Sequence, residues 1–412
     1  MTALVVGVFA ATYAGMALGR VPGLKIDRTG IALLALAVLL ATGATDVTGV
    51  GREIDAPTLL LLFALMILSA QFAAGGLYGL AARAITRARA GPVALLALTV
   101  AISGGLSAVL ANDIVVFAMT PLLCAGLRAR GLDPRPFLLA LVGASNAGSA
   151  ATLIGNPQNI LIGQKSGLDF WEFLLVCGPP AAAGLLIVFA AVWLVWRPVL
   201  TRVDPALAGA HALAGGGTAD RLQIAKGTVA TLVLIALFAT PVPREVGAMA
   251  VAAALLISRK LATREMLGAV DWHLLLLFMC LFAVTGTFAE TGLAANGLAW
   301  LAAHGVLPDR LAVLAPLSLA MSNGIGNVPS VILLLQIWPA PPEGALYGLA
   351  VLSTLSGNLL LTGSLANIIA AERAAAAGVP LGFADFARSG VPMTLASMAV
   401  AVLWLAWGGW MD

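Results

Sequence analysis

Charged residues are scarce in this chain: Asp, Glu, Lys and Arg together make up 10% of 412 residues, while hydrophobic residues make up 61%. The mean hydropathy is +1.01, and a water-soluble domain could not bury so much apolar surface. The scarcity of charge therefore excludes a soluble protein. It predicts an all-α protein that crosses the membrane many times.

Motifs that would indicate an enzyme are also missing. The three cysteines, Cys124, Cys177 and Cys280, lie in or near apolar runs without the CxxC spacing of a metal site or disulfide framework. The sequence has no GxxxxGK[ST] for ATP binding, no HExxH and no nucleophile motif. We therefore expect no enzyme, no cofactor apart from a coupling ion, and no nucleic-acid partner.

Ten apolar segments are candidates to cross a bilayer, which takes about 20 apolar residues in a helix. They are residues 2–19, 30–49, 57–80, 137–163, 172–196, 228–241, 246–258, 272–289, 345–370 and 390–410. The first is expected to be a retained span and not a cleaved signal, because no basic residue precedes it. Two further stretches, 92–127 and 311–338, are too long for one crossing, which predicts either two crossings or a re-entrant hairpin in each.

The basic residues decide between these options, because Lys and Arg collect in cytoplasmic loops. If both stretches are re-entrant hairpins and the N-terminus lies outside, 18 of the 22 Lys and Arg residues fall in inside loops. The four left outside are Arg52, Lys165, Arg244 and Arg310. This distribution predicts a multi-pass protein of the cytoplasmic membrane with both termini outside.

The order of segments then occurs twice: three spans, a hairpin and two spans. Each half has five crossings, an odd number, so the second half is inserted upside down relative to the first, as an inverted-topology repeat. We expect the first repeat at 1–196, a cytoplasmic linker at 197–227 and the second repeat at 228–412. The linker is expected to be flexible because it contains the Ala/Gly-rich sequence AGAHALAGGGTAD.

One span in each half is interrupted by a polar, helix-breaking cluster. The first break is at 155–159, within SNAGSAATLIGNPQNILIG, and the second at 363–367, within LSGNLLLTGSLANIIAA. A shift of 208 positions places Gly155 on Gly363 and Asn159 on Asn367. Free backbone groups at membrane depth are tolerated only where they line protein or a wet cavity, and the start of a half-helix attracts anions. The alternative is a proline kink with polar packing.

Asn112 and Asp113 lie side by side at the expected tip of the first hairpin, in the middle of an apolar run. A carboxylate near mid-membrane costs about 2.5 to 3.5 kcal/mol, so it normally faces a wet cavity or a partner. At the second tip Asn327 aligns with Asn112, and Val328 takes the place of Asp113. We therefore expect Asp113 to be the coupling residue, with a structural cap at the turn as the alternative.

These features define the candidate residues for binding substrate or ion. They are Asn112, Asp113, Gly155, Asn156, Pro157, Gln158, Asn159, Asn327, Pro329, Asn358, Gly363, Ser364 and Asn367. If the coupling ion is Na⁺ and not H⁺, we expect it near Asn112 and Gly155 and near Asn327 and Gly363.

Four segments, ANDIVVFAMTPLL, ATLIGNPQNILIG, GNVPSVILLL and SGNLLLTGSLANIIAAERAAAAG, resemble the ion transporter superfamily, and the likeness in architecture covers nearly the whole chain. This superfamily includes arsenite permeases, P-protein-like permeases, citrate-metal symporters and sodium-coupled dicarboxylate symporters. The resemblance implies hairpin tips that meet the broken helices around substrate and coupling ions, in a homodimer with an elevator-like motion.

The tips resemble some branches more than others. The dicarboxylate branch has a Ser-Asn-Thr triplet at each tip, whereas residues 111–113 and 326–328 of this chain keep only the asparagine. The tips resemble the arsenite permeases and their anion-permease relatives, and GNPQN resembles the P-protein-like side.

We therefore expect a secondary transporter for a small inorganic or organic anion, first an oxyanion such as arsenite or antimonite, coupled to H⁺ or Na⁺. An arsenite-permease-like protein would also have a cytoplasmic ATPase subunit as partner. The alternatives are a sodium-coupled dicarboxylate or citrate symporter and a Na⁺/H⁺ antiporter. A channel is disfavoured, because paired hairpins favour a gated site at the midplane.

Overall fold

The computed structural model describes residues 1–18, 25–200, 202, 219–338 and 340–412. All regular elements in these ranges are helical. Five helices are long and apolar enough to cross a membrane by length and composition alone: α4 (Ala56–Ala74), α6 (Pro92–Val109), α10 (Phe170–Leu200), α14 (Trp272–Ala289) and α20 (Phe383–Trp407). The protein is therefore an all-helical, multi-pass membrane protein, as the sequence predicted.

The helices of these described ranges form two successive sets of ten. The first set continues with α1 (Thr2–Leu18), α2 (Arg28–Ala41), α3 (Val47–Glu53), α5 (Leu77–Arg87), α7 (Asn112–Arg128), α8 (Arg135–Ser149) and α9 (Pro157–Ser166). The second adds α11 (Arg221–Leu237), α12 (Arg244–Leu256), α13 (Thr263–Gly268), α15 (Leu293–Ala303), α16 (Leu311–Ile325), α17 (Asn327–Ile337), α18 (Glu343–Ser356) and α19 (Leu365–Ala376). Each helix of the first set has a counterpart ten labels later.

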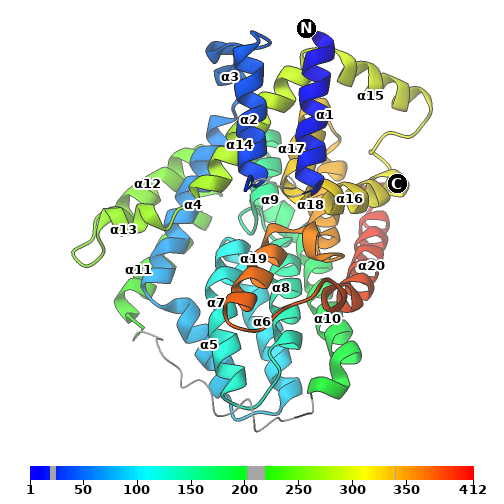
Figure 1. Ribbon diagram of the computed structural model, residues 1–412. Helices are drawn as coiled ribbons and strands as arrows, with labels where there is room; N and C mark the ends of the chain where they lie inside the picture. Colours follow the sequence, from blue (N-terminus) through cyan, green and yellow to red (C-terminus); the bar gives the residue numbers. More distant parts are fainter. Residues whose placement is uncertain (19–24, 201, 203–218, 339) are drawn as a thin grey trace.

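The two sets are inverted relative to each other. Helices α6 and α7, which form the first hairpin, lie in the lower half of Figure 1, whereas α16 and α17 of the second hairpin lie in the upper half. The short helices α5 and α15 lie at opposite ends of the molecule in the same view (Figure 1). That each hairpin enters and leaves the membrane on the same side stays a prediction. One hairpin helix, α6, is by itself long and apolar enough to cross the membrane.

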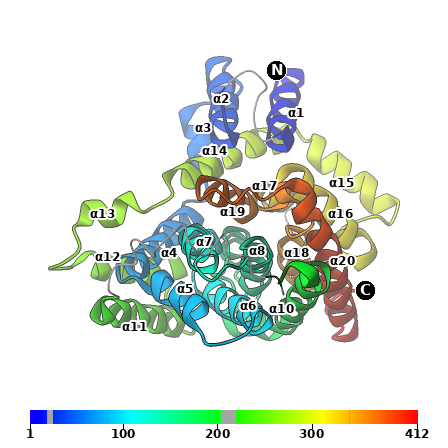
Figure 2. The same ribbon diagram turned by 60° about the horizontal axis from the view of Figure 1, so that its bottom comes forward.

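Two groups of helices can be distinguished by their packing. The central group consists of α6–α10 and α16–α20, in which α8 packs on α6 and α10, and α18 on α16 and α20. The outer group consists of α1–α4 and α11–α14, in which α4 packs on α12 and α2 on α14. Figure 2 shows α7 and α8 near the middle, with α1, α2 and α11–α13 toward the periphery.

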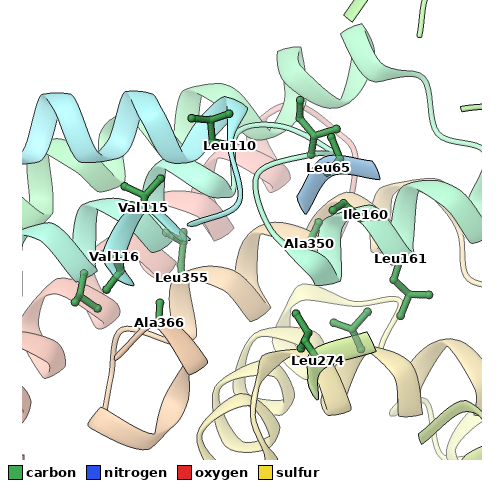
Figure 3. Packing of buried hydrophobic residues seen from close by; sticks show 14 of the residues in the cluster. Leu65, Leu110, Val115, Val116, Ile160, Leu161, Leu274, Ala350, Leu355 and Ala366 are labelled. Carbon is green, nitrogen blue, oxygen red and sulfur yellow. The ribbon is translucent and has the colours of Figure 1, made fainter. Parts of the chain in front are cut away.

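The centre of the molecule is formed by α8 and α18. Residues 136–149 of α8 and 345–356 of α18 are all buried, which is typical of helices surrounded by other helices. The broken helices pack against this centre, α9 on α18 and α19 on α8. On its other side α9 packs on α4, and Figure 3 shows Leu65 of α4 beside Ile160 of α9. The polar breaks are thus surrounded by a tightly packed apolar core.

Both breaks are wider than predicted. The first covers residues 150–156, and the second covers 357–364 with one short 3-10 turn, η1 (Leu361–Gly363). The predicted ranges 155–159 and 363–367 included the first turns of α9 and α19. The chain leaves the helix earlier because buried side-chain amides bind the carbonyls that the helix would otherwise use.

Two predicted boundaries were wrong. The span 57–80 ends at Ala74, because Gly75 and the left-handed Gly76 (φ 76°) separate α4 from α5. The linker 197–227 is shorter than predicted, since α10 continues to Leu200 and α11 begins at Arg221. Asp220 caps α11 by accepting from the backbone N–H groups of residues 222 and 223. Most of the remaining linker lies outside the described residues.

Candidate functional site

The starts of six helices meet around one cavity of about 310 Å³. These are α7 and α17, which begin at the hairpin tips, α9 and α19, which begin after the breaks, and α2 and α14 from the outer group. Seven of the predicted site residues line the cavity: Asn112, Asp113, Pro157, Gln158, Asn327, Pro329 and Ser364. The topology therefore brings both tips and both breaks to one place.

Helix N-termini give this cavity a positive character, since each is equivalent to about half a positive charge. Two of the six are neutralised by their own caps: Asp27 accepts from Gly30 N (2.9 Å) and Asp271 from Leu274 N (3.0 Å). At α7, α17 and α19 no side-chain cap is formed by the residues that the structure describes. These helix starts can therefore bind an anion through their N–H groups.

Charged side chains complete the lining. Within the described part of the chain, Arg28 contributes a positive charge, and Asp113 and Glu372 contribute negative charges besides the two capping aspartates. His273 lies next to them on α14. The cavity therefore combines groups that attract anions with carboxylates that can exchange protons.

The two tip asparagines contact equivalent residues of the two breaks. Asn112 N donates to the Gly155 carbonyl (3.2 Å), and the Asn112 carbonyl accepts from Ser145 Oγ (3.2 Å). In the second repeat Asn327 Nδ2 donates to the carbonyls of Gly363 (2.7 Å) and Ser353 (3.3 Å). Gly363 and Ser353 follow Gly155 and Ser145 by 208 positions, so the two tips contact equivalent residues, the first through backbone atoms of Asn112 and the second through the side-chain amide of Asn327.

Gly155 and Gly363 allow this close approach. A Cβ atom on Gly155 would lie 2.8 Å from the Ser107 carbonyl oxygen, and one on Gly363 would lie 2.5 Å from Asn323 Oδ1. Both distances are shorter than carbon atoms tolerate in packed interiors. These glycines therefore serve to seat the hairpin tips, and their carbonyls are already engaged by the tip asparagines.

The remaining predicted residues lie behind the cavity wall. Asn156 caps α9 by accepting from Asn159 N (2.9 Å), and Pro157 begins the helix. Asn358 Nδ2 donates to the Gly143 carbonyl (3.1 Å). Asn159 and Asn367 bind carbonyls of their own breaks. These four asparagines hold the breaks in shape and do not line the main cavity.

Each break is also tied to the other repeat. Asn146 of α8 donates to Asn358 Oδ1 (2.8 Å) and Asn367 Oδ1 (3.0 Å), and accepts from Ser364 Oγ (3.2 Å). Thr354 of α18, which follows Asn146 by 208 positions, accepts from Asn156 Nδ2 (3.3 Å) and Gln158 Nε2 (3.1 Å). The two breaks therefore cannot move independently without losing buried hydrogen bonds.

One buried acceptor suits a small cation. Asn112 Oδ1 is buried and has no hydrogen-bond donor among the described residues, while its Nδ2 donates to Asn146 Oδ1 (3.1 Å). Hard cations such as Na⁺ prefer oxygen ligands of this kind. The residues at the first tip therefore fit the predicted ion position, which stays a prediction.

Several residues of this site were not among the predicted ones. Arg28, Asp271, His273 and Glu372 all line the cavity. The first three lie there because α2 and α14 begin at the cavity, and Glu372 lies there on α19. Asn146 and Thr354 were also missed, although they occupy equivalent positions before the two breaks.

Comparison with known proteins gives matches to membrane transporters. A model of the citrate transporter family, CitMHS, matches residues 13–345. The uncharacterized transporter Rv2684 of Mycobacterium tuberculosis is 30% identical over 428 residues, which cover 98% of each chain. The silicon efflux transporter LSI3 of Oryza sativa is 26% identical over 456 residues and 93% of each chain.

A solved structure shares the fold. The crystal structure of the YdaH transporter from Alcanivorax borkumensis matches with a TM-score of 0.54 at 16% identity, over 99% of this chain and 98% of that one. The inverted helical sets around a shared cavity are those of a membrane transporter. The chain belongs to the citrate transporter family CitMHS, within the ion transporter superfamily that its motifs resemble.

Proposed function

We propose that this protein is a secondary active transporter for a small anion, first an oxyanion such as arsenite or antimonite, coupled to H⁺ or Na⁺. The observation that carries the proposal is the cavity into which four helix starts from the central group open beside Arg28. Helix N-termini and a guanidinium both bind oxyanions through N–H donors.

The charge balance favours one small anion. Six helix starts, about +3 in total, and Arg28 face the four carboxylates of Asp27, Asp113, Asp271 and Glu372. The sum is about zero when all four carboxylates are ionised and about +1 when Asp113 carries a proton. A substrate with one negative charge would balance the protonated cavity.

Asp113 provides a mechanism for coupling. It begins α7 beside Asn112, at the tip of the hairpin that touches the first break. A proton on Asp113 removes a negative charge from the cavity and strengthens the attraction for an anion. If Na⁺ is the coupling ion, Asn112 Oδ1 is the acceptor available for it.

The family description favours a second candidate, citrate. A citrate trianion alone would meet four carboxylates in this cavity, with Arg28 as its arginine partner among the described residues. Citrate bound to a divalent cation would carry less negative charge, and the cavity carboxylates could approach the metal. We therefore propose a metal–citrate complex as the alternative substrate.

The test is uptake and counterflow by the purified protein in proteoliposomes. The solutes are arsenite, antimonite, silicate, phosphate, succinate, and citrate with and without Mg²⁺, each with imposed H⁺ or Na⁺ gradients. Silicate is included because of the name of the rice relative. Gradient-driven accumulation of an inorganic oxyanion supports the proposal, and accumulation of citrate only with the metal supports the alternative. Proton–sodium exchange without any anion would overturn both in favour of an antiporter.

A further inference from the structure

The cavity exists because one pair of equivalent helices is separated while the other is packed. In the first repeat α9 packs against α4, and Figure 3 shows Ile160 of α9 beside Leu65 of α4. Their counterparts α19 and α14 do not pack comparably among the described helices. Instead the cavity lies between them, lined by Leu274 and Leu277 on one side and by Ile368 and Ile369 on the other.

The burial pattern fixes the register between α2 and α12. The buried residues of α2 are Ile31, Ala32, Ala35, Leu36 and Leu39. The buried residues of α12 are Gly247, Ala248, Val251, Ala252 and Leu255, and each follows its counterpart by 216 positions. Because the same face is buried in both helices, Arg28 at the start of α2 is equivalent to Arg244 at the start of α12.

Arg244 grips the end of α9. Its Nη1 donates to the Gly163 carbonyl (2.9 Å), and its Nη2 donates to the Leu168 carbonyl. The next residue, Glu245, accepts through Oε2 from Gln164 Nε2 (2.7 Å). The start of α12 therefore holds the C-terminal end of a broken helix against the outer group.

Arg28 makes no equivalent grip among the described residues. Its Nε donates to the Met16 carbonyl (3.2 Å), and its guanidinium lines the cavity. Nη1 lies 3.5 Å from the position that a Cβ atom would take on Gly326, the residue before the second tip asparagine. Arg28 thus lies beside the start of the hairpin helix α17, whereas Arg244 holds the end of the broken helix α9.

The groups needed for an equivalent grip are present on α19. A shift of 208 positions takes Gly163 to Ala371 and Gln164 to Glu372. A shift of 216 positions takes Thr29 to Glu245. The pair of Gln164 and Glu245 therefore corresponds to Glu372 and Thr29, which both line the cavity and again combine a carboxylate with a hydrogen-bond donor.

We propose that Arg28 and Arg244 exchange roles between the two access states of the transporter. In the state described here Arg244 grips the end of α9 and Arg28 faces the substrate cavity. In the opposite state Arg28 grips the end of α19 at the Ala371 carbonyl, Thr29 donates to Glu372, and Arg244 faces a cavity opened between α4 and α9. The inference rests on the proposed transport function.

The exchange requires a displacement along α19. Ser364 and Leu365 at the start of α19 line the cavity together with Arg28, and Ala371 lies about seven residues further along, which at 1.5 Å per residue is on the order of 10 Å. The arginine that faces the cavity is then the cationic member of the substrate site in that state. Each arginine is a positioning residue in one state and contacts substrate in the other.

The test uses two cysteine pairs in a background where Cys124, Cys177 and Cys280 are replaced by alanine. One pair is Gln164→Cys with Glu245→Cys, which reports the described state, and the other is Thr29→Cys with Glu372→Cys, which reports the opposite state. A short bifunctional thiol reagent is applied to protein in liposomes. We expect each pair to crosslink, and crosslinking of one pair to prevent crosslinking of the other in the four-cysteine variant.

Replacing either arginine should shift the crosslinking toward one of the two states. Arg244→Ala should lower crosslinking of the first pair and raise that of the second, and Arg28→Ala should do the opposite. Two fixed pairs serve as controls: Arg135→Cys with Asp385→Cys in the central group, and Asp220→Cys with Lys260→Cys in the outer group. Their crosslinking should not change with either alanine variant.

Two results would overturn the proposal: both pairs crosslinking in the same molecule, or a Thr29–Glu372 pair that stays unreactive while the control pairs react. The crosslinking needs no substrate, so it stands even if the solute screen finds none. Conversely, gradient-driven uptake with a failed crosslinking pattern would retain the transporter and remove the exchange.

Discussion

Asn159 and Asn367, which are 208 positions apart, make the same two hydrogen bonds in the two halves of the molecule. Asn159 Nδ2 donates to the carbonyls of Ser149 (3.2 Å) and Thr152 (3.0 Å). Asn367 Nδ2 donates to those of Gly357 (2.7 Å) and Leu360 (2.9 Å). In each case the acceptors lie ten and seven residues earlier, so one amide closes each break onto the following half-helix.

Replacing either amide should therefore destabilise the protein, and replacing Asn367 should cost more, because its Oδ1 also accepts from Asn146 Nδ2 (3.0 Å). Asn159→Ala leaves the Thr152 carbonyl without a donor and Asn367→Ala leaves that of Gly357, since the Ser149 and Leu360 carbonyls keep Asn156 Nδ2 and Gly363 N. An unsatisfied buried group costs about 1–3 kcal/mol. We expect both variants to lower the Tm in detergent and to reduce uptake. Asn296→Ala on the exposed face of α15 is the matched control and should leave the Tm unchanged. A loss confined to one of the two breaks would contradict their equivalence.

Gly155→Ala tests the seat of the first tip. The added methyl group would lie 2.7 Å from Ser149 Cα and 2.8 Å from the Ser107 carbonyl oxygen, both backbone atoms that cannot rotate away. We expect the tip to be displaced, with loss of transport and of folded protein in gel filtration. Gly297→Ala on α15, where no atom lies within 4 Å, should fold normally. Normal transport by Gly155→Ala would show that the tip is not seated on this glycine.

The repeat and its breaks could be predicted from the sequence because they depend on local patterns. Proline and asparagine in an apolar run, such as Asn156 and Pro157, interrupt a helix wherever the chain folds. The alternation of spans and basic loops follows from composition alone. The meeting of the hairpin tips with the broken helices was expected only from the resemblance to the ion transporter superfamily, and the contacts of Asn112 and Asn327 with Gly155 and Gly363 come from the structure.

The charged half of the cavity could not be predicted in this way. Arg28 and Asp271 stand at helix starts next to polar residues, a pattern that equally indicates an exposed loop. Their position in the cavity depends on how α2 and α14 pack against the central group, which is a long-range contact. The equivalence of Arg28 and Arg244 needed the burial of both helices, because few other residues of α2 and α12 are identical.

Asp113→Asn should separate coupling from folding. The amide has nearly the same shape but carries no titratable proton, so the cavity keeps its volume and loses a charge that protonation could remove. We expect unchanged Tm and gel-filtration profile, substrate binding that is retained, and uptake that no longer responds to an imposed proton gradient. Asp309→Asn, near the start of α16 and away from the cavity, is the control. Proton-driven uptake at the wild-type rate by Asp113→Asn would remove this residue from the coupling mechanism.

Asn146 joins the two breaks, and its loss should cost more than the loss of Thr354. Asn146 is fully buried and makes four side-chain hydrogen bonds, to Asn112, Ser364, Asn358 and Asn367. Thr354 accepts two. At about 1 kcal/mol for each lost bond, Asn146→Ala should reduce the free energy of unfolding by about twice as much as Thr354→Ala.

Asn146→Ala and Thr354→Ala also test whether the hydrogen bonds that link the two breaks are equivalent in function as well as in position. Because each residue forms hydrogen bonds with the break of the other repeat, both variants should lower the rate of uptake more than they lower substrate affinity. Equilibrium binding measures the affinity separately from the rate of uptake. Thr228→Ala, an exposed threonine bonded only within its own helix, controls for the removed hydroxyl. Asn146 has partners in both repeats, so releasing one break can also release the other. In that case the double variant should lose less free energy of unfolding than the sum of the losses of the two single variants.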